Sequence, residues 1–206
     1  MRLYRGIGTA LAGVIALAFA VTTALAQQAI DPVVALSERS IGSPDAPVTV
    51  IEYFSLTCPH CASFHNDVYG DLKQKYMDTG KVRFVYREFP RDGVDLRAGM
   101  MARCADPRRY AGLVKVLFKN QPNWTRSNDP VGELAKIGRL AGIDDATFES
   151  CMASEDLANG LLAARQNAST LGVQSTPTFE IDGQLYPGPQ SIEEFSEIID
   201  PLLANN

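Results

Sequence analysis

Residues 54–64 read FSLTCPHCASF, so two cysteines, Cys58 and Cys61, stand with two residues between them directly after an apolar run. Residues 48–56 are rich in β-branched and aromatic side chains, which is typical of a buried strand. Over residues 58–79 the apolar side chains recur at helical spacing, and a Thr-Gly-Lys turn ends the pattern. The sequence therefore predicts a strand that leads into a helix, with the cysteine pair at the start of the helix.

The segments that follow predict a mixed sheet interrupted by helices. Residues 82–90, VRFVYREFP, form a second predicted strand, so residues 48–90 make a strand-helix-strand unit suited to parallel pairing. Residues 95–171 contain helical patterns separated by turn residues, without a convincing strand. Residues 178–181 and 184–186 then flank an Asp-Gly turn, which is a strong hairpin signal, and a final helix follows. The predicted fold class is α/β with an all-helical insertion.

The first residues have the layout of a signal peptide. Arg2 and Arg5 precede a long uncharged stretch rich in alanine, leucine and valine, and the segment Ala24-Leu25-Ala26 offers the small residues that a signal peptidase recognises. Cleavage after Ala26 would leave a chain long enough for one domain with a real core. We interpret this segment as a bacterial Sec-type signal, which predicts export to the periplasm. The alternative is an uncleaved membrane anchor.

The charge balance argues against a nucleic-acid partner. The chain has 19 basic and 24 acidic residues and a formal net charge of −5, whereas nucleic-acid binding depends on basic surfaces. Export also changes the meaning of the four cysteines, because disulfides form and persist outside the cytoplasm. The cysteine motif therefore indicates redox chemistry more than metal binding.

Two other interpretations of the cysteine motif stay open. A zinc site could combine Cys58, Cys61 and His65 with Cys104 or Cys151, although the sequence has no second CxxC motif to complete it. A structural disulfide between Cys58 and Cys61 would close a very short loop and would stabilise the fold little. A reactive pair explains the spacing better, because the amides and the dipole at a helix start stabilise a thiolate.

The helix start gives the two cysteines different expected roles. Cys58 is predicted to be the exposed nucleophile, and Cys61, one helical turn later, is predicted to be its shielded partner. A hydrogen-bond donor or a positive imidazole at His60 would stabilise the Cys58 thiolate further. Stabilising the reduced pair in this way makes the corresponding disulfide a stronger oxidant.

The CPHC motif, the helical insertion and the stretch STPTF at 175–179 together carry a family signature. The chain resembles the DsbA-type thiol:disulfide oxidoreductases of the thioredoxin-fold superfamily over essentially all of its expected mature part. The resemblance implies a thioredoxin fold with an inserted all-helical domain. The expected layout is a signal peptide at 1–26, a short lead at 27–43, a thioredoxin-like domain at 44–92 and 172–206, and a helical insertion at 93–171.

The resemblance also implies which residues act beside the cysteines. In this family the proline that faces the active site is cis, which implies a cis Pro177, with Thr176 presenting backbone groups to an extended substrate and Pro59 as a further substrate-binding residue. Glu52 matches a buried acid that relays protons to the second cysteine, here Cys61. The alternative for Glu52 is an edge-strand charge that faces water.

A second cysteine pair lies in the predicted helical insertion. Cys104 and Cys151 belong to segments expected to pack in one helical layer, export makes oxidation available, and the even cysteine count leaves no thiol over. Some relatives carry an additional disulfide in this region, so we predict a structural disulfide between Cys104 and Cys151. Two buried free thiols are the alternative.

The predicted function is that of an enzyme, a periplasmic dithiol oxidase that donates the Cys58–Cys61 disulfide to exported, unfolded proteins with free thiols. The expected redox partner is a quinone-linked membrane protein of the DsbB type, and neither a cofactor nor a metal is expected. The short lead at 27–43 has no room for a dimerisation domain, which favours a monomer. The alternatives are a disulfide isomerase or reductase on the same scaffold, and a periplasmic copper-binding protein.

Overall fold

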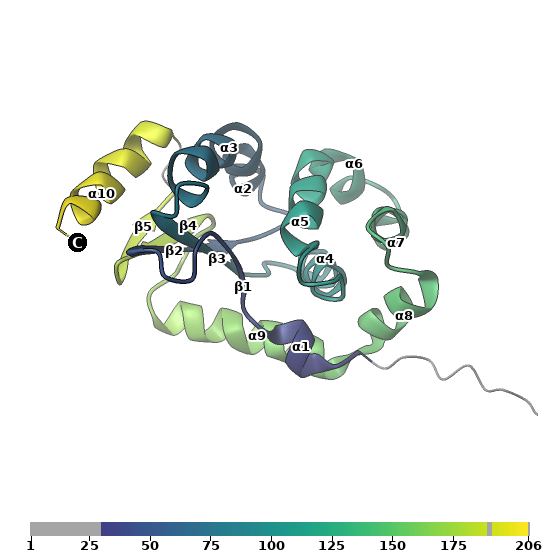
Figure 1. Cartoon of the computed structure of the whole chain (residues 1–206). Helices are drawn as coiled ribbons and strands as arrows, with labels where there is room; N and C mark the ends of the chain where they lie inside the picture. The colour runs from purple at the N-terminus through teal and green to yellow at the C-terminus, as the bar shows by residue number, and fades with distance from the viewer. Residues whose placement is uncertain (1–29, 189–190, 206) are drawn as a thin grey trace, which may run out of the picture.

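The computed structural model describes residues 30–188 and 191–205. The expected signal peptide at 1–26 lies outside the described residues and stays a prediction. The centre of the fold is a five-stranded sheet with the strand order β1-β3-β2-β4-β5 (Figure 1). Its strands are β1 (Arg39–Ile41), β2 (Val48–Phe54), β3 (Val82–Glu88), β4 (Thr178–Ile181) and β5 (Gln184–Pro187).

Strand β2 occupies the middle of the sheet. It pairs in parallel with β3 and antiparallel with β4, so that Glu52 lies opposite Tyr86 on one side and Phe179 on the other. The turn between β4 and β5 places Asp182 at φ 51° and Gly183 at φ 75°, the left-handed conformations that an Asp-Gly hairpin turn favours. The predicted parallel unit and the predicted hairpin are both confirmed.

A nearly continuous helical run connects β2 to β3 along one face of the sheet. The sequence predicts one regular helix over 58–79, but two of the four observed segments are π-helical. Each π-helical segment holds two consecutive buried residues, Phe64 and His65 in one and Tyr76 and Met77 in the other. The segments are α2 (Pro59–Ser63), η1 (Phe64–Val68), α3 (Tyr69–Leu72) and η2 (Lys73–Met77), and α10 (Ile192–Ala204) lies beside α3 on the same face (Figure 1).

The chain between β3 and β4, residues 89–177, contains six helices joined by turns and irregular stretches, and no strand. Side chains of Asp92, Asp129, Asp144 and Ser154 accept amide hydrogen bonds at four of the helix starts, which explains why the helices begin where they do. The helices are α4 (Gly93–Arg103), α5 (Tyr110–Lys119), α6 (Gln121–Thr125), α7 (Pro130–Leu140), α8 (Asp145–Ala153) and α9 (Glu155–Thr170).

Helix α9 returns from this helical region to cover the second face of the sheet (Figure 1). There Ala168 packs with Tyr53, Phe89 and Val173 in a small apolar cluster. A mixed sheet covered on both faces, with helices inserted between β3 and β4, confirms the predicted fold class. The predicted domain boundaries at 92/93 and 171/172 stay a prediction. Within the described residues, we find no helix with both the length and the apolar character needed to cross a membrane.

The N-terminal lead contains a short helix and a short edge strand. Asp31 accepts amide hydrogen bonds at the start of α1 (Pro32–Leu36), and Pro32 suits the first helical position. Strand β1 then pairs antiparallel with β3 and extends the sheet by one edge strand. A three-residue strand has too short a pattern to be recognised in the sequence.

Candidate active site

The two cysteines of the CPHC motif lie where β2 meets its helix. Cys58 is the N-cap residue of α2, with an extended backbone at φ −79° and ψ 122°, and Pro59 takes the first helical position. Both Cys58 and Cys61 are free thiols. The expectation of an exposed Cys58 is wrong, since Cys58 is 2% exposed and Cys61 0%. Thr176 lies against the Cys58 sulfur, and the Gln121 side chain binds the Cys58 carbonyl oxygen.

Access to a groove distinguishes the two cysteines. Cys58 lines a hollow of about 590 Å³, whereas Cys61 is not among its lining residues. Pro59 and His60 are exposed at the same groove. The other lining residues are Phe89, Arg91, Arg165, Gln174, Ser175 and Thr176. A reacting group in this groove therefore meets the Cys58 sulfur first.

The surroundings shift the pKa values of the two thiols in opposite directions. The pKa of Cys58 is lowered to about 4, chiefly by a hydrogen bond from the Cys61 thiol, although burial acts to raise it. The Thr176 side chain and the amides of His60 and Cys61 lower this pKa as well. Burial raises the pKa of Cys61 far above its ordinary value, helped by hydrogen bonding to Cys58 and by the negative charge of Glu52. Cys58 is therefore the residue that holds a thiolate.

A loop ahead of β4 faces Cys58. The peptide bond between Thr176 and Pro177 is cis, and the protonated Cys58 Sγ donates to the Thr176 carbonyl oxygen at 3.2 Å. This geometry places the Thr176 backbone beside the sulfur, at the edge of the groove. The substrate-binding roles of Pro59, Thr176 and Pro177 stay predictions.

Behind the cysteines, Glu52 is buried and pairs with a histidine. Glu52 is 0% exposed, so it is not an edge charge facing water. The His65 Nε2 lies 2.9 Å and 3.2 Å from the two carboxylate oxygens, and the His65 ring stacks on Phe118 at 4.3 Å and on Tyr69 at 5.0 Å between centroids. Because His65 follows Cys61 by four residues, the sequence could have placed them on one helix face.

Two buried polar residues from the helical region hold the loop that leads to Cys58. Asp95 on α4 accepts from the Leu56 amide at 2.8 Å, and its second oxygen accepts from the Arg91 amide at 2.9 Å. Gln121 on α6 donates its Nε2 to the carbonyl oxygens of Leu56 and Cys58 at 2.8 Å and 2.9 Å. Neither residue could be identified from the sequence, because each acts across a long separation in the chain.

The second cysteine pair forms a disulfide. Cys104 at the end of α4 and Cys151 in α8 are bonded, with 6.3 Å between their Cα atoms and a sequence separation of 47. The bond joins two helices of the inserted region. It also leaves neither sulfur as a thiolate ligand, and no cluster of three or more metal-ligating side chains occurs among the residues that the structure describes.

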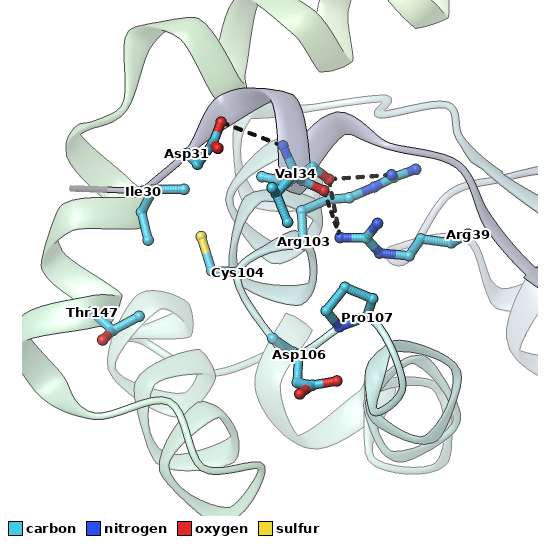
Figure 2. A pocket seen from close by; sticks show the side chains of 11 residues that line it. Ile30, Asp31, Val34, Arg39, Arg103, Cys104, Asp106, Pro107 and Thr147 are labelled. Atoms are coloured by element: carbon cyan, nitrogen blue, oxygen red, sulfur yellow. Dashed lines mark hydrogen bonds between the residues drawn. The ribbon is translucent and has the colours of Figure 1, made fainter. Parts of the chain in front are cut away.

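A second hollow, of about 500 Å³, lies between α1 and the helical region. Figure 2 shows Arg39 and Arg103 converging on the backbone of α1, with Cys104 at the wall of the hollow. Arg39 donates to the carbonyl oxygens of Val34 and Ala35, and Arg103 donates to the Ala35 carbonyl while it pairs with Glu88. These cations therefore serve to attach α1 to the rest of the fold.

Comparisons with known proteins agree with this geometry. Residues 35–201 match the sequence model of the thioredoxin family. Over 170 residues the chain is 36% identical to a putative protein-disulfide oxidoreductase of Rickettsia bellii, a match that covers 81% of this chain and 65% of the relative. The chain thus spans slightly less than two thirds of that relative's length.

Solved structures also resemble the whole fold. The crystal structure of alpha-DsbA1 from Wolbachia pipientis superimposes with a TM-score of 0.77 at 29% identity, covering 82% of this chain and 92% of the other. A protein-disulfide isomerase from Novosphingobium aromaticivorans superimposes with a TM-score of 0.69 at 27% identity, covering 80% and 97%. This chain therefore belongs to the thioredoxin family and, within it, to the DsbA-type proteins.

Proposed function

We propose that this protein is a thiol:disulfide oxidoreductase that works as a dithiol oxidase on exported proteins. The observation that carries the proposal is the difference between the two thiols: the pKa of Cys58 is lowered to about 4, whereas burial raises the pKa of Cys61. A thiolate that is stabilised only in the reduced pair favours reduction of the Cys58–Cys61 disulfide. The pair is therefore suited to accept electrons from other thiols.

The exchange takes place in two steps that begin with the oxidised pair. A substrate thiolate attacks the Cys58 sulfur, a mixed disulfide forms, and Cys61 leaves and takes up a proton. A second substrate thiolate then attacks the substrate sulfur of the mixed disulfide, and Cys58 leaves as a thiolate. The substrate loses two electrons and gains a disulfide, while the pair gains those two electrons. Glu52 lies behind Cys61 and serves as the proton source for its departure.

The same proposal includes a location and a redox partner. The signal-peptide layout of residues 1–26 supports export to the periplasm. Each turnover leaves the pair reduced, so a second protein must remove two electrons, and a quinone-linked membrane protein of the DsbB type is the proposed partner. The protein acts as a monomer on unfolded chains with free thiols.

Equilibration with glutathione tests the direction of the reaction. The purified protein is incubated at fixed ratios of oxidised to reduced glutathione. Free thiols at Cys58 and Cys61 are then trapped by alkylation, and the oxidised and reduced fractions are quantified by mass spectrometry. We expect the pair to be reduced even in oxidising mixtures. A potential near that of thioredoxin, about −270 mV, would assign the protein to reductases.

A disulfide isomerase is the second candidate, since one of the structural relatives is described as a protein-disulfide isomerase. An isomerase must rearrange wrong disulfides, whereas an oxidase mainly adds new ones. The two functions separate when the protein is given either a reduced or a scrambled multi-disulfide substrate. The oxidase proposal expects rapid oxidation of the reduced form and slow recovery of the scrambled form.

A further inference from the structure

The groove beside Cys58 is positively charged. Its lining contains two arginines, Arg91 and Arg165, and the exposed His60, but no aspartate or glutamate. This lining differs from the balance of the whole chain, which has a net charge of −5. The positive charge is therefore a local property of the groove and not a consequence of composition.

The two arginines of the groove have no carboxylate partners among the residues that the structure describes. Elsewhere in that part of the chain, arginines are commonly neutralised by nearby acids. Arg83 and Arg87 both pair with Glu38, and Arg139 pairs with Asp145. Arg91 and Arg165 form no such ion pair. Their charges are available to a bound molecule.

Packing orients the Arg165 charge, whereas Arg91 is anchored at the groove through its backbone. The Arg165 guanidinium on α9 lies 5.2 Å above the centroid of the Phe89 ring, its side chain is half-buried, and its Nε has no hydrogen-bond partner in the described part of the chain. Stacking on an aromatic ring orients a guanidinium without neutralising it. Arg91 is exposed, but its backbone is fixed by the hydrogen bond from its amide to Asp95.

We propose that this groove selects substrates with acidic side chains next to the reacting cysteine. An aspartate or glutamate beside the substrate thiol would lie near Arg165 and Arg91 while the sulfur meets Cys58. The attraction favours such segments over basic ones and weakens as salt screens the charges. This inference rests on the proposed function, because it concerns the substrates of the Cys58–Cys61 disulfide.

Matched peptides test the selection directly. Three peptides with a single cysteine flanked on both sides by glutamate, glutamine or lysine are reacted with the oxidised protein, and the rate of mixed-disulfide formation is measured. Each rate is divided by the thiolate fraction of its peptide, determined separately. We expect the glutamate peptide to react about fivefold faster than the lysine peptide at low salt, and the ratio to approach one at high salt. The acidic net charge of the whole protein alone would give the opposite order.

Variants assign the effect to the groove. Arg165→Gln should reduce the ratio to about twofold or less, Arg165→Lys should keep most of it, and the exposed Arg91→Gln provides a second variant that leaves the stacking on Phe89 intact. Arg139→Gln is the control, because it removes the same charge from α7, which contributes no residue to the groove.

A small neutral thiol separates this inference from the proposed function. β-Mercaptoethanol should reduce the Cys58–Cys61 disulfide in the wild type and, at a similar rate, in the control variant Arg139→Gln. Reaction with β-mercaptoethanol but equal rates for the three peptides would overturn the inference alone, as would a preference that Arg165→Gln and Arg91→Gln leave unchanged. A disulfide that reacts with none of these thiols would overturn the proposed function and this inference together.

Discussion

The two cysteine pairs of this chain have opposite states. Cys58 and Cys61 are free thiols, whereas Cys104 and Cys151 are bonded. Burial does not separate them, because Cys58, Cys61 and Cys151 are all at most 2% exposed. The position relative to a helix distinguishes Cys58 from Cys104. Cys58 precedes the first turn of α2, where backbone amides stabilise a thiolate. Cys104 follows the last turn of α4, where carbonyl groups do not stabilise a thiolate.

Helix α4 connects the two pairs. Asp95 in its first turn binds the amide of Leu56, two residues ahead of Cys58, and Cys104 caps its other end. One helix therefore supports the reactive loop at its start and carries the disulfide at its end. The reactive pair and the bonded pair are therefore supported by different ends of one helix, and their two uses should be separable by mutation.

The largest expected effect is on exchange through the first pair. Cys58→Ser should slow oxidation of a reduced dithiol peptide at least about 1,000-fold, since no other sulfur lines the groove. The double variant Cys104→Ala/Cys151→Ala should stay within about twofold of the wild type in the same fluorescence assay. If the double variant lost activity to a similar extent, the division of roles between the pairs would be wrong.

Stability should show the reverse pattern. Removing the Cys104–Cys151 bond, with its sequence separation of 47, should lower the free energy of unfolding by about 4 kcal/mol on the chain-entropy account. Urea unfolding followed by circular dichroism measures the change in Cys104→Ala/Cys151→Ala. The matched control is Cys58→Ala/Cys61→Ala, compared with the reduced wild type so that the first pair carries no disulfide in either protein. A loss below about 1 kcal/mol in the first double variant would show that the helices are held by packing instead.

Much of the fold around the reactive pair could be predicted from local sequence. The apolar run before Cys58, the helical spacing after it and the Asp-Gly turn identify the central strand, the following helix and the hairpin, because each signal lies within a few residues. The short edge strand and the π-helical turns could not be predicted, since both depend on what the segment packs against. Local patterns therefore indicate the elements more reliably than their irregularities.

The supports of the site were harder to predict than its cysteines. Gln121 stands in the stretch NQPNW, which reads as a turn between helices, yet its side chain reaches Leu56, 65 residues earlier. Asp95 bridges 39 residues to the same loop. His65 has helical spacing from Cys61, but the sequence alone does not say whether it turns to a metal or to Glu52. Such contacts depend on tertiary packing, which no single segment encodes.

A smaller effect should appear in the pH dependence of stability. Burial raises the pKa of Asp95 from 3.8 to about 6, so the folded protein binds this proton more tightly than the unfolded chain does. The free energy of unfolding should therefore rise by about 2 to 3 kcal/mol as the pH falls from 6 to below 4, through this group alone. In Asp95→Asn this contribution should disappear, which urea unfolding at several pH values measures.

The control for Asp95 uses the other end of α4. The rise in the free energy of unfolding at low pH should persist in Cys104→Ala/Cys151→Ala, where Asp95 is still present. The second pair does not titrate while bonded, and it lies at the opposite end of the helix. Identical pH profiles for the wild type and Asp95→Asn would show that the carboxylate keeps an ordinary proton affinity in the fold.

The smallest expected effect concerns the buried acid behind the reactive pair. Glu52 is fully buried, pairs with His65, and its charge helps to raise the pKa of Cys61. When Cys61 leaves as a thiol, a proton must reach a sulfur that is not among the residues lining the groove, and the proposed source of this proton is Glu52. Glu52→Gln keeps the shape and a hydrogen bond to His65 but cannot exchange a proton.

We therefore expect Glu52→Gln to slow the Cys61 steps about tenfold and to flatten their pH dependence. Stopped-flow mixing with a substrate peptide at several pH values measures these steps. Alkylation of Cys58 in the reduced protein is the internal control, and it should stay nearly unchanged because the hydrogen bonds that lower the pKa of Cys58 come from Cys61, Thr176 and His60. A pH profile identical to that of the wild type would make Glu52 and His65 a structural pair, and the chemistry of the site would then rest on the helix start alone.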